Sequence, residues 1–111
     1  MSGTTALPDT DVEQEQKTKR QPPYNVILLN DDAHSMEFVV EVLCKALGYN
    51  EARSLELMMK AHTDGRAVVY TGPHEVAELK ADQIATFHEV RERDSRDLGP
   101  LGCEVEPAPG E

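Results

Sequence analysis

The first apolar run of the chain, Tyr24–Leu29, contains four consecutive aliphatic residues at positions 26–29. An unbroken run of this kind is typical of a strand that is covered on both faces, at the centre of a sheet. After the run, Ser35 suits the N-cap of a helix at about Met36–Leu47, and Gly48 suits its C′ position. The apolar residues of this helix have the spacing of a buried stripe, namely Val39, Val42, Leu43, Ala46 and Leu47.

The remaining apolar segments predict two more helices and two more strands. A second helix is expected at 51–62, with Asn50 as its N-cap and its end at 63–65. One side of it is expected to be buried, carrying Ala52, Leu55, Met58, Met59 and His62. The pattern then indicates a strand at 66–71, a third helix at 74–92, a loop at 94–100 and a last strand at 101–105.

This order, β-α-α-β-α-β, predicts an α+β fold in which helices cover a small antiparallel three-stranded sheet. A chain of 111 residues has room for one such domain. We expect its folded core at 24–106. Residues 1–23 are polar and end in two prolines, so we expect a disordered N-terminal arm there, and a flexible tail at 107–111.

The net charge of −10 argues against nucleic acid and anionic membrane surfaces as partners, because both attract basic patches. A partner that carries basic or amine groups fits this charge better. Cys44 and Cys103 lack the spacing of a C-x-x-C motif, and we expect both to be free thiols. There is no apolar leader and no apolar run of about 20 residues, so we expect a cytoplasmic protein. We also expect it to be a monomer.

The junction Asn30-Asp31-Asp32 places an amide and two carboxylates where a strand passes into a helix, at the edge of the core. If the first two helices form a hairpin, the beginning of the first lies beside the end of the second. Met36, Met58 and His62 would then meet this junction. Together they would form an apolar hole with a polar rim, which is the usual construction of a small-ligand site.

Each of these residues also has a purely structural interpretation. Asp31 and Asp32 could be solvated turn residues, and His62 could only interact with the dipole of its helix. Met58 and Met59 could simply fill the core, and for Met59 we expect this. We expect His34 to be exposed in a turn.

Two other site chemistries have weaker support. Asp31, Asp32, His34 and His62 could ligate a metal, but the sequence lacks an HxxxH or HExxH motif and a cysteine cluster. A hydrolase would need a nucleophile beside a base, and the neighbours His34 and Ser35 do not face each other at the beginning of a helix. We therefore expect no catalysis, no metal and no cofactor.

The motifs closely resemble those of the ClpS family, adaptors of the AAA+ protease machines ClpAP and, in some lineages, ClpCP. The resemblance covers about residues 22–105. It rests on Leu29-Asn-Asp-Asp32, Met36-Glu-Phe-Val-Val40, Leu57-Met58 with His62 and Gly65, and Glu75-Val-Ala-Glu78 with Lys80.

The resemblance implies that the protein binds N-degrons, proteins whose first residue is Leu, Phe, Tyr or Trp. The free α-amino group would be held by Asn30 and His62, with Asp31 and Asp32 forming an acidic rim. The side-chain pocket would be lined by Leu28, Leu29, His34, Met36, Val39, Met58, Ala61 and Leu101. The N-terminal domain of ClpA or ClpC would dock on Glu75, Glu78 and Lys80, and the arm would assist delivery.

The sequence departs from the family pattern at two places in the pocket. His34-Ser35 stands where Thr-Pro is usual, and Ala61 stands where Val is usual. The preference among bulky first residues is therefore open. The alternative is a non-catalytic interaction domain resembling the C-terminal domain of the ribosomal stalk, which has a similar β-α-α-β order and needs neither a cavity nor an acceptor rim.

Overall fold

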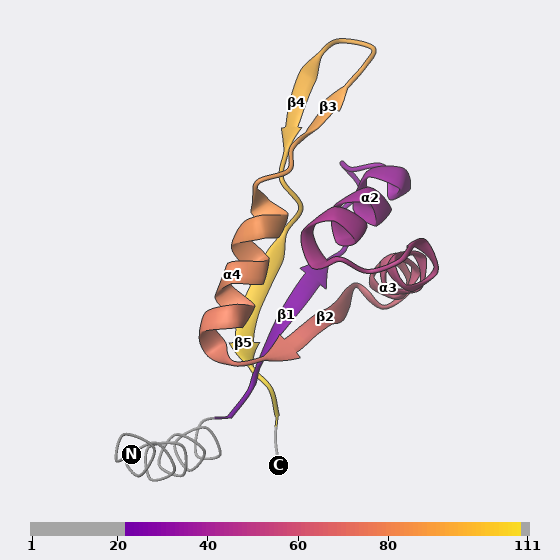
Figure 1. Cartoon of the computed structure of the whole chain (residues 1–111). Helices are drawn as coiled ribbons and strands as arrows, with labels where there is room; N and C mark the ends of the chain where they lie inside the picture. The colour runs from indigo at the N-terminus through magenta and orange to yellow at the C-terminus, as the bar shows by residue number, and fades with distance from the viewer. Residues whose placement is uncertain (1–21, 110–111) are drawn as a thin grey trace, which may run out of the picture.

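The structure is a computed structural model, and it describes residues 22–109. The predicted N-terminal arm and the end of the predicted tail lie outside the described residues. The elements are β1 (Tyr24–Leu29), α2 (Met36–Leu47), α3 (Glu51–Asp64), β2 (Arg66–Gly72), α4 (His74–Ala85), β3 (Glu89–Arg91), β4 (Arg96–Gly99) and β5 (Cys103–Pro107) (Figure 1). No helix among residues 22–109 is long and apolar enough to cross a membrane.

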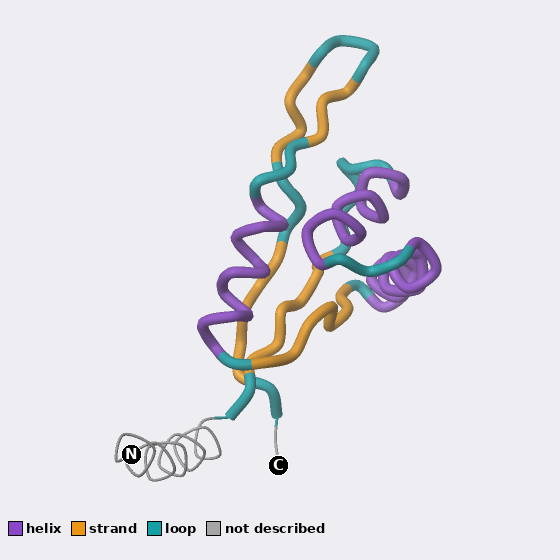
Figure 2. The backbone as a smooth tube through the Cα atoms, viewed as in Figure 1, coloured by secondary structure: helices purple, strands orange, loops and turns teal. Residues whose placement is uncertain are grey.

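The main sheet has three antiparallel strands in the order β2-β1-β5, so β1 is the central strand, as predicted (Figure 2). Val26 pairs with Tyr70 on one side and with Val105 on the other. Val26, Ile27 and Leu28 are each at most 2% exposed, which explains the unbroken apolar run. The two ends of the described chain meet at the same edge, where the Ala108 N–H donates to the Pro23 carbonyl.

The helices cover this sheet, in agreement with the predicted fold class. α4 packs against all three strands, α3 packs against β2, and α2 lies against both α3 and α4 (Figure 1). The largest core side chains come from β1, α2 and α4. The predicted stripe of α2 is buried at Val42, Leu43 and Leu47, while Val39 and Ala46 are half-buried against the same core.

The predicted helix caps are present. The Ser35 hydroxyl accepts a hydrogen bond from the Phe38 N–H, and the Asn50 side chain accepts one from the Arg53 N–H. Gly48 ends α2 with a φ of 75°, a left-handed conformation that glycine adopts without steric cost. These local bonds fix where α2 and α3 begin, and hence which residues stand at the rim of the site.

The third helix is shorter than predicted: α4 ends at Ala85, and residues 89–99 form a two-stranded hairpin instead of helix and loop. The Thr86 N–H and hydroxyl both donate to the Gln83 carbonyl, which closes the last turn three residues back and stops the helix. Phe87 then packs against the core. The hairpin projects beyond the body of the domain (Figure 1), and β5 begins two residues later than predicted.

The buried face of α3 also differs from the prediction. The buried residues are Ser54, Leu57, Met58 and Ala61, whereas Leu55 is 48% and Met59 43% exposed. Ala52 and His62 are exposed as well. The small Ser54 faces α2, where the Cys44 thiol donates to its hydroxyl at 3.3 Å. Close contact between the helices thus favours a face with small residues over the face with more apolar ones.

Candidate functional site

The end of β1 is tied by its backbone to the last turn of α3. The Asn30 N–H donates to the Gly65 carbonyl at 3.0 Å, and the Gly65 N–H donates to the Ala61 carbonyl at 2.8 Å. Gly65 has a φ of 91°, which lets the chain reverse directly after α3. The Asn30 side chain therefore stands beside the helical turn that carries Ala61 and His62.

The loop between β1 and α2 is organised by Asp31. One carboxylate oxygen of Asp31 accepts from the backbone N–H groups of Ala33 and His34, both at 3.0 Å. Both carboxylate oxygens lie 3.0 Å from His34 Nδ1. Asp31 is exposed, but it uses most of its acceptor capacity within the protein, so the turn is fixed by hydrogen bonds.

His34 is not the exposed turn residue that the sequence suggested, because its side chain is only 4% exposed. Its Nε2 lies 2.9 Å from the Gly99 carbonyl, and its ring stacks on Phe38 with centroids 5.5 Å apart. Both ring nitrogens face acceptors, the carboxylate of Asp31 and the carbonyl of Gly99. Only the doubly protonated ring satisfies both.

The charges of this pair follow from its surroundings. Desolvation alone would lower the pKa of His34, but the bonds to Gly99 and Asp31 and the nearby charge of Glu89 raise that pKa above its usual value. Desolvation alone would raise the pKa of Asp31, but its bonds to His34 and to the backbone lower that pKa. The two shifts favour an ion pair at the edge of the site.

The beginning of α2 is fixed by a carboxylate from the hairpin. Glu89 on β3 accepts from the Ser35 N–H at 3.0 Å and from the Ser35 hydroxyl at 2.8 Å. Sequence reasoning placed Glu89 inside a helix and did not connect Gly99 with the site. No local signal in the sequence identifies either contact, because both depend on the hairpin folding back on the loop.

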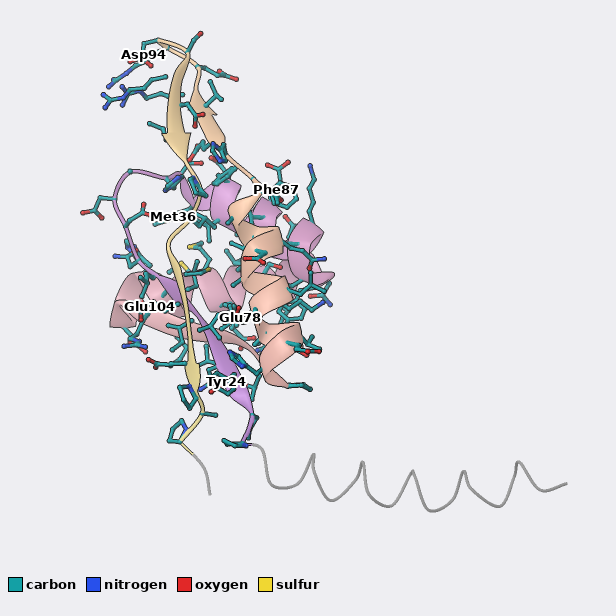
Figure 3. The ribbon with its side chains drawn as sticks, turned by 90° about the vertical axis from the view of Figure 1, so that its left-hand side faces the viewer. Tyr24, Met36, Glu78, Phe87, Asp94 and Glu104 are labelled. Atoms are coloured by element: carbon teal, nitrogen blue, oxygen red, sulfur yellow. The ribbon has the colours of Figure 1, made fainter. Side chains whose placement is uncertain are left out.

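These elements enclose a cavity of about 200 Å³. It is smaller than the ~300–1,000 Å³ of sites for drug-sized ligands, so a single amino-acid side chain suits it better. Four of its lining residues, Leu28, Met58, Ala61 and Leu101, are at most 5% exposed. Met36, which is labelled in Figure 3, is 48% exposed and therefore stands at the mouth. The lining residues are Leu28, Leu29, Asn30, Asp31, Asp32, His34, Met36, Val39, Met58, Ala61, His62 and Leu101.

The structure therefore brings together every residue that the sequence suggested for the α-amino site and for the side-chain pocket. The rim offers oxygen and nitrogen acceptors from Asn30, Asp32 and His62, and the interior is apolar. Such a site suits a ligand with a donor-bearing cationic end next to an apolar group. The individual binding roles of these residues remain predictions.

The residues suggested for partner docking lie elsewhere, on α4. Glu75 and Glu78 are exposed, and Glu78 is labelled in Figure 3. Glu78 Oε2 lies 3.1 Å from His74 Nε2. Lys80 is half-buried, with its Nζ 5.7 Å from the centre of the Tyr70 ring. None of the three lines the cavity, so α4 presents a separate polar surface.

Comparison with known families adds the decisive observation. Residues 19–104 match the family model described as ATP-dependent Clp protease adaptor protein ClpS. The chain belongs to the ClpS family. The ClpS adapter protein of Roseobacter denitrificans is 46% identical over 90 residues, which are 81% of this chain and 74% of that protein. The ClpS adapter protein of Vibrio atlanticus is 35% identical over 103 residues, which are 91% and 92% of the two chains.

A solved ClpS structure shares the fold. Agrobacterium tumefaciens ClpS2 bound to L-phenylalaninamide superimposes with a TM-score of 0.65 and 33% sequence identity. The match covers 78% of this chain and 98% of that one. The ligand of that ClpS protein, L-phenylalaninamide, is the amide of one aromatic amino acid and has a free α-amino group.

Proposed function

We propose that this ClpS protein is an adaptor that binds proteins with Leu, Phe, Tyr or Trp as first residue and delivers them to a Clp AAA+ unfoldase-protease. The observation that carries the proposal is the cavity itself, which has the size of one side chain, an apolar interior and acceptors at its rim. The phenylalaninamide bound by the Agrobacterium relative supports it.

The α-amino group of a protein suits this rim. Its pKa of about 7.7–8.0 leaves it mostly charged at neutral pH, and it offers three donors. We assign its direct hydrogen bonds to Asn30, His62 and Asp32. Asp31 acts through its charge and by holding the loop, because its oxygens already accept three hydrogen-bond donors within the protein.

The energetics fit an adaptor that must release its cargo. Burial of one Leu or Phe side chain contributes roughly 1.5–3 kcal/mol. Each hydrogen bond to a charged group adds about 1.5–3 kcal/mol. After the cost of ordering both partners, these contributions are consistent with micromolar binding, about −8 kcal/mol.

We further propose that α4, through Glu75, Glu78 and Lys80, docks on the N-terminal domain of ClpA or ClpC. We also propose that the adaptor works in the cytoplasm without catalysis of its own.

We propose that residues 1–23 act in the delivery of the bound protein to the unfoldase. Removal of residues 1–21 should leave peptide affinity unchanged and slow the degradation of a reporter by the partner protease. Unimpaired degradation would contradict this role.

The test of binding compares a Phe-starting peptide with its Nα-acetylated form by fluorescence anisotropy. Acetylation removes the charge and two donors, so the acetylated peptide should not bind measurably. Asn30→Ala and His62→Ala should each weaken binding by about 1.5–3 kcal/mol. Lys60→Ala, an exposed change on the same helix as His62, is the control. Equal binding of both peptides would refute the assignment of the rim.

A further inference from the structure

The β3–β4 hairpin is joined to the rest of the domain through the loop before α2. Within residues 22–109, the hydrogen bonds that connect residues 88–99 to other parts of the protein all end on His34 and Ser35. The tip of the hairpin, labelled at Asp94 in Figure 3, points away from the domain. The base of the hairpin therefore meets the domain at the same loop that forms one wall of the cavity.

The two contacts come from one cross-strand pair. Glu89 on β3 pairs with Gly99 on β4, and the register of the two strands shifts directly after Glu89. Irregularities of this kind change the direction in which a side chain points. Gly99 has a φ of 79°, and its N–H donates to the Asp97 carboxylate at 2.7 Å, which fixes the direction of its carbonyl. Two paired residues thus reach two consecutive loop residues, Ser35 and His34.

The carboxylate of Glu89 takes both donors of Ser35. One oxygen accepts from the Ser35 N–H at 3.0 Å and the other accepts from the Ser35 hydroxyl at 2.8 Å. Because the hydroxyl hydrogen points to Glu89, the lone pairs of the hydroxyl remain available, and the hydroxyl accepts from the Phe38 N–H at 3.1 Å. Glu89 therefore supports the N-cap of α2 from outside the helix.

The residue that follows Ser35 is Met36, the first residue of α2, at the mouth of the cavity. Its side chain is 48% exposed, so little packing holds it, and its position depends on the backbone of Ser35. A fixed side chain at the mouth would clash with first residues that branch at the β-carbon, such as Val and Ile. Neither Glu89 nor Gly99 lines the cavity, so both act on it only through the loop.

We propose that Glu89 is a positioning residue for first-residue selection. Together with Gly99 it clamps the loop before α2, holds Met36 at the mouth and thereby excludes first residues that branch at the β-carbon. The proposal rests on the proposed function, because a first residue must enter the cavity. It gives the hairpin a role in substrate selection without contact to the substrate.

The test measures, for the full chain, the affinities of two peptides that differ only in a first residue of Phe or Ile, by fluorescence anisotropy. Glu89→Ala leaves both donors of Ser35 without their acceptor and loosens Met36. The ratio of the Phe affinity to the Ile affinity should therefore fall by about threefold to tenfold. Partial unfolding would lower both affinities by the same factor, so the ratio reports on the mouth of the cavity and not on stability.

Two variants separate the clamp from other effects. Glu89→Gln keeps an oxygen for the Ser35 N–H and a nitrogen within reach of the hydroxyl, so the ratio should stay within about twofold of the unmodified protein. A Gln variant that behaves like the Ala variant would mean that the charge acts, and would overturn the clamp. The matched control is Glu92→Ala, an exposed glutamate in the turn of the same hairpin, which should leave the ratio unchanged.

A double-mutant cycle tests whether Glu89 acts through Met36. In a Met36→Ala background the gate is absent, so adding Glu89→Ala should change the ratio by less than about twofold. An equal fall with and without Met36, or no fall in Glu89→Ala alone, refutes the positioning role, and so does equal binding of both peptides by the unmodified protein. In these cases binding of the Phe peptide still supports the proposed function. If the unmodified protein does not bind the Phe peptide, both proposals are refuted.

Discussion

The two walls of the cavity are built by different forces. The wall from α3 consists of Met58 and Ala61, which are 5% and 3% exposed and continue directly into the core beside Leu57. The other wall is the loop before α2. There the Asp31 carboxylate accepts from the Ala33 and His34 N–H groups, and the His34 ring lies within hydrogen-bond distance of the Gly99 carbonyl.

This difference decides what each wall responds to. Burial of apolar surface depends little on pH, so the α3 wall is a fixed surface against which a side chain can pack. The loop wall depends on the protonation of His34 and on the β3–β4 hairpin, which supplies Gly99 and Glu89. We expect substitutions in the α3 wall to affect mainly stability, and substitutions in the loop wall to affect pH dependence as well.

The largest expected effect is on the core beside the α3 wall. Leu57→Ala removes a side chain that is 4% exposed and should lower the free energy of unfolding by about 2–5 kcal/mol in urea denaturation. Leu55→Ala on the same helix, at 48% exposure, is the matched control and should stay within about 0.5 kcal/mol. Similar losses for both would contradict the observed orientation of α3.

The next largest expected effect is on the loop wall. His34→Ala leaves the Gly99 carbonyl and the Asp31 carboxylate without their ring partner and should lower the free energy of unfolding by about 1–3 kcal/mol. The control is His88→Ala, because His88 also faces an aspartate, Asp97, but is 48% exposed. This variant should lower the free energy of unfolding by at most about 1 kcal/mol. Equal losses would mean that burial of His34 has no energetic role.

The mouth of the cavity should control which first residues enter. Met36 would lean over the β-carbon of the bound residue, so Val and Ile, which branch there, should be excluded. Met36→Ala should raise affinity for Ile-starting peptides about tenfold, or ~1.4 kcal/mol, with little loss of stability because Met36 is half exposed. Tight binding of an Ile-starting peptide by the unmodified protein would show that Met36 is not the gate.

The α3 wall should determine the preference among the first residues that the cavity accepts. Ala61 is 3% exposed and lines the cavity, so Ala61→Val adds two methyl groups to the wall and narrows the cavity. Aromatic first residues should lose affinity relative to Leu, by a few fold, because the void around Leu is filled. Peptides that differ only at the first residue measure the shift, and an unchanged order would place Ala61 outside the binding surface.

The smallest expected effect is the pH dependence of the loop wall. The raised pKa of His34 adds stability that is complete below its unfolded value of about 6.5 and is lost as pH rises through the folded value. The lowered pKa of Asp31 adds stability above its unfolded value of about 3.9, which is lost as pH falls through the folded value. Asp31→Asn should therefore lose more stability at pH 5.5 than at pH 8.5, and a loss independent of pH would refute the ion pair.

Several features of the fold could be predicted because their causes lie within a few residues. The caps at Ser35 and Asn50 and the turn at Gly48 are local hydrogen-bonding and steric effects. The same holds for the continuous apolar run of β1, which needs both faces of a strand to be covered. The meeting of Met36, Met58 and His62 could be proposed because spacing along α2 and α3 determines which side chains share a helical turn. The other residues of the side-chain pocket were implied by the resemblance to the ClpS family.

Only the tertiary structure decided the rest. The buried face of α3 depends on the close approach of Cys44 to Ser54 across two helices, and apolar periodicity within α3 favours another face. The burial of His34 depends on Gly99, which lies 65 residues further along the chain. Local sequence patterns carry no information about such distant partners, because the contacts form only when the hairpin and the helices have packed.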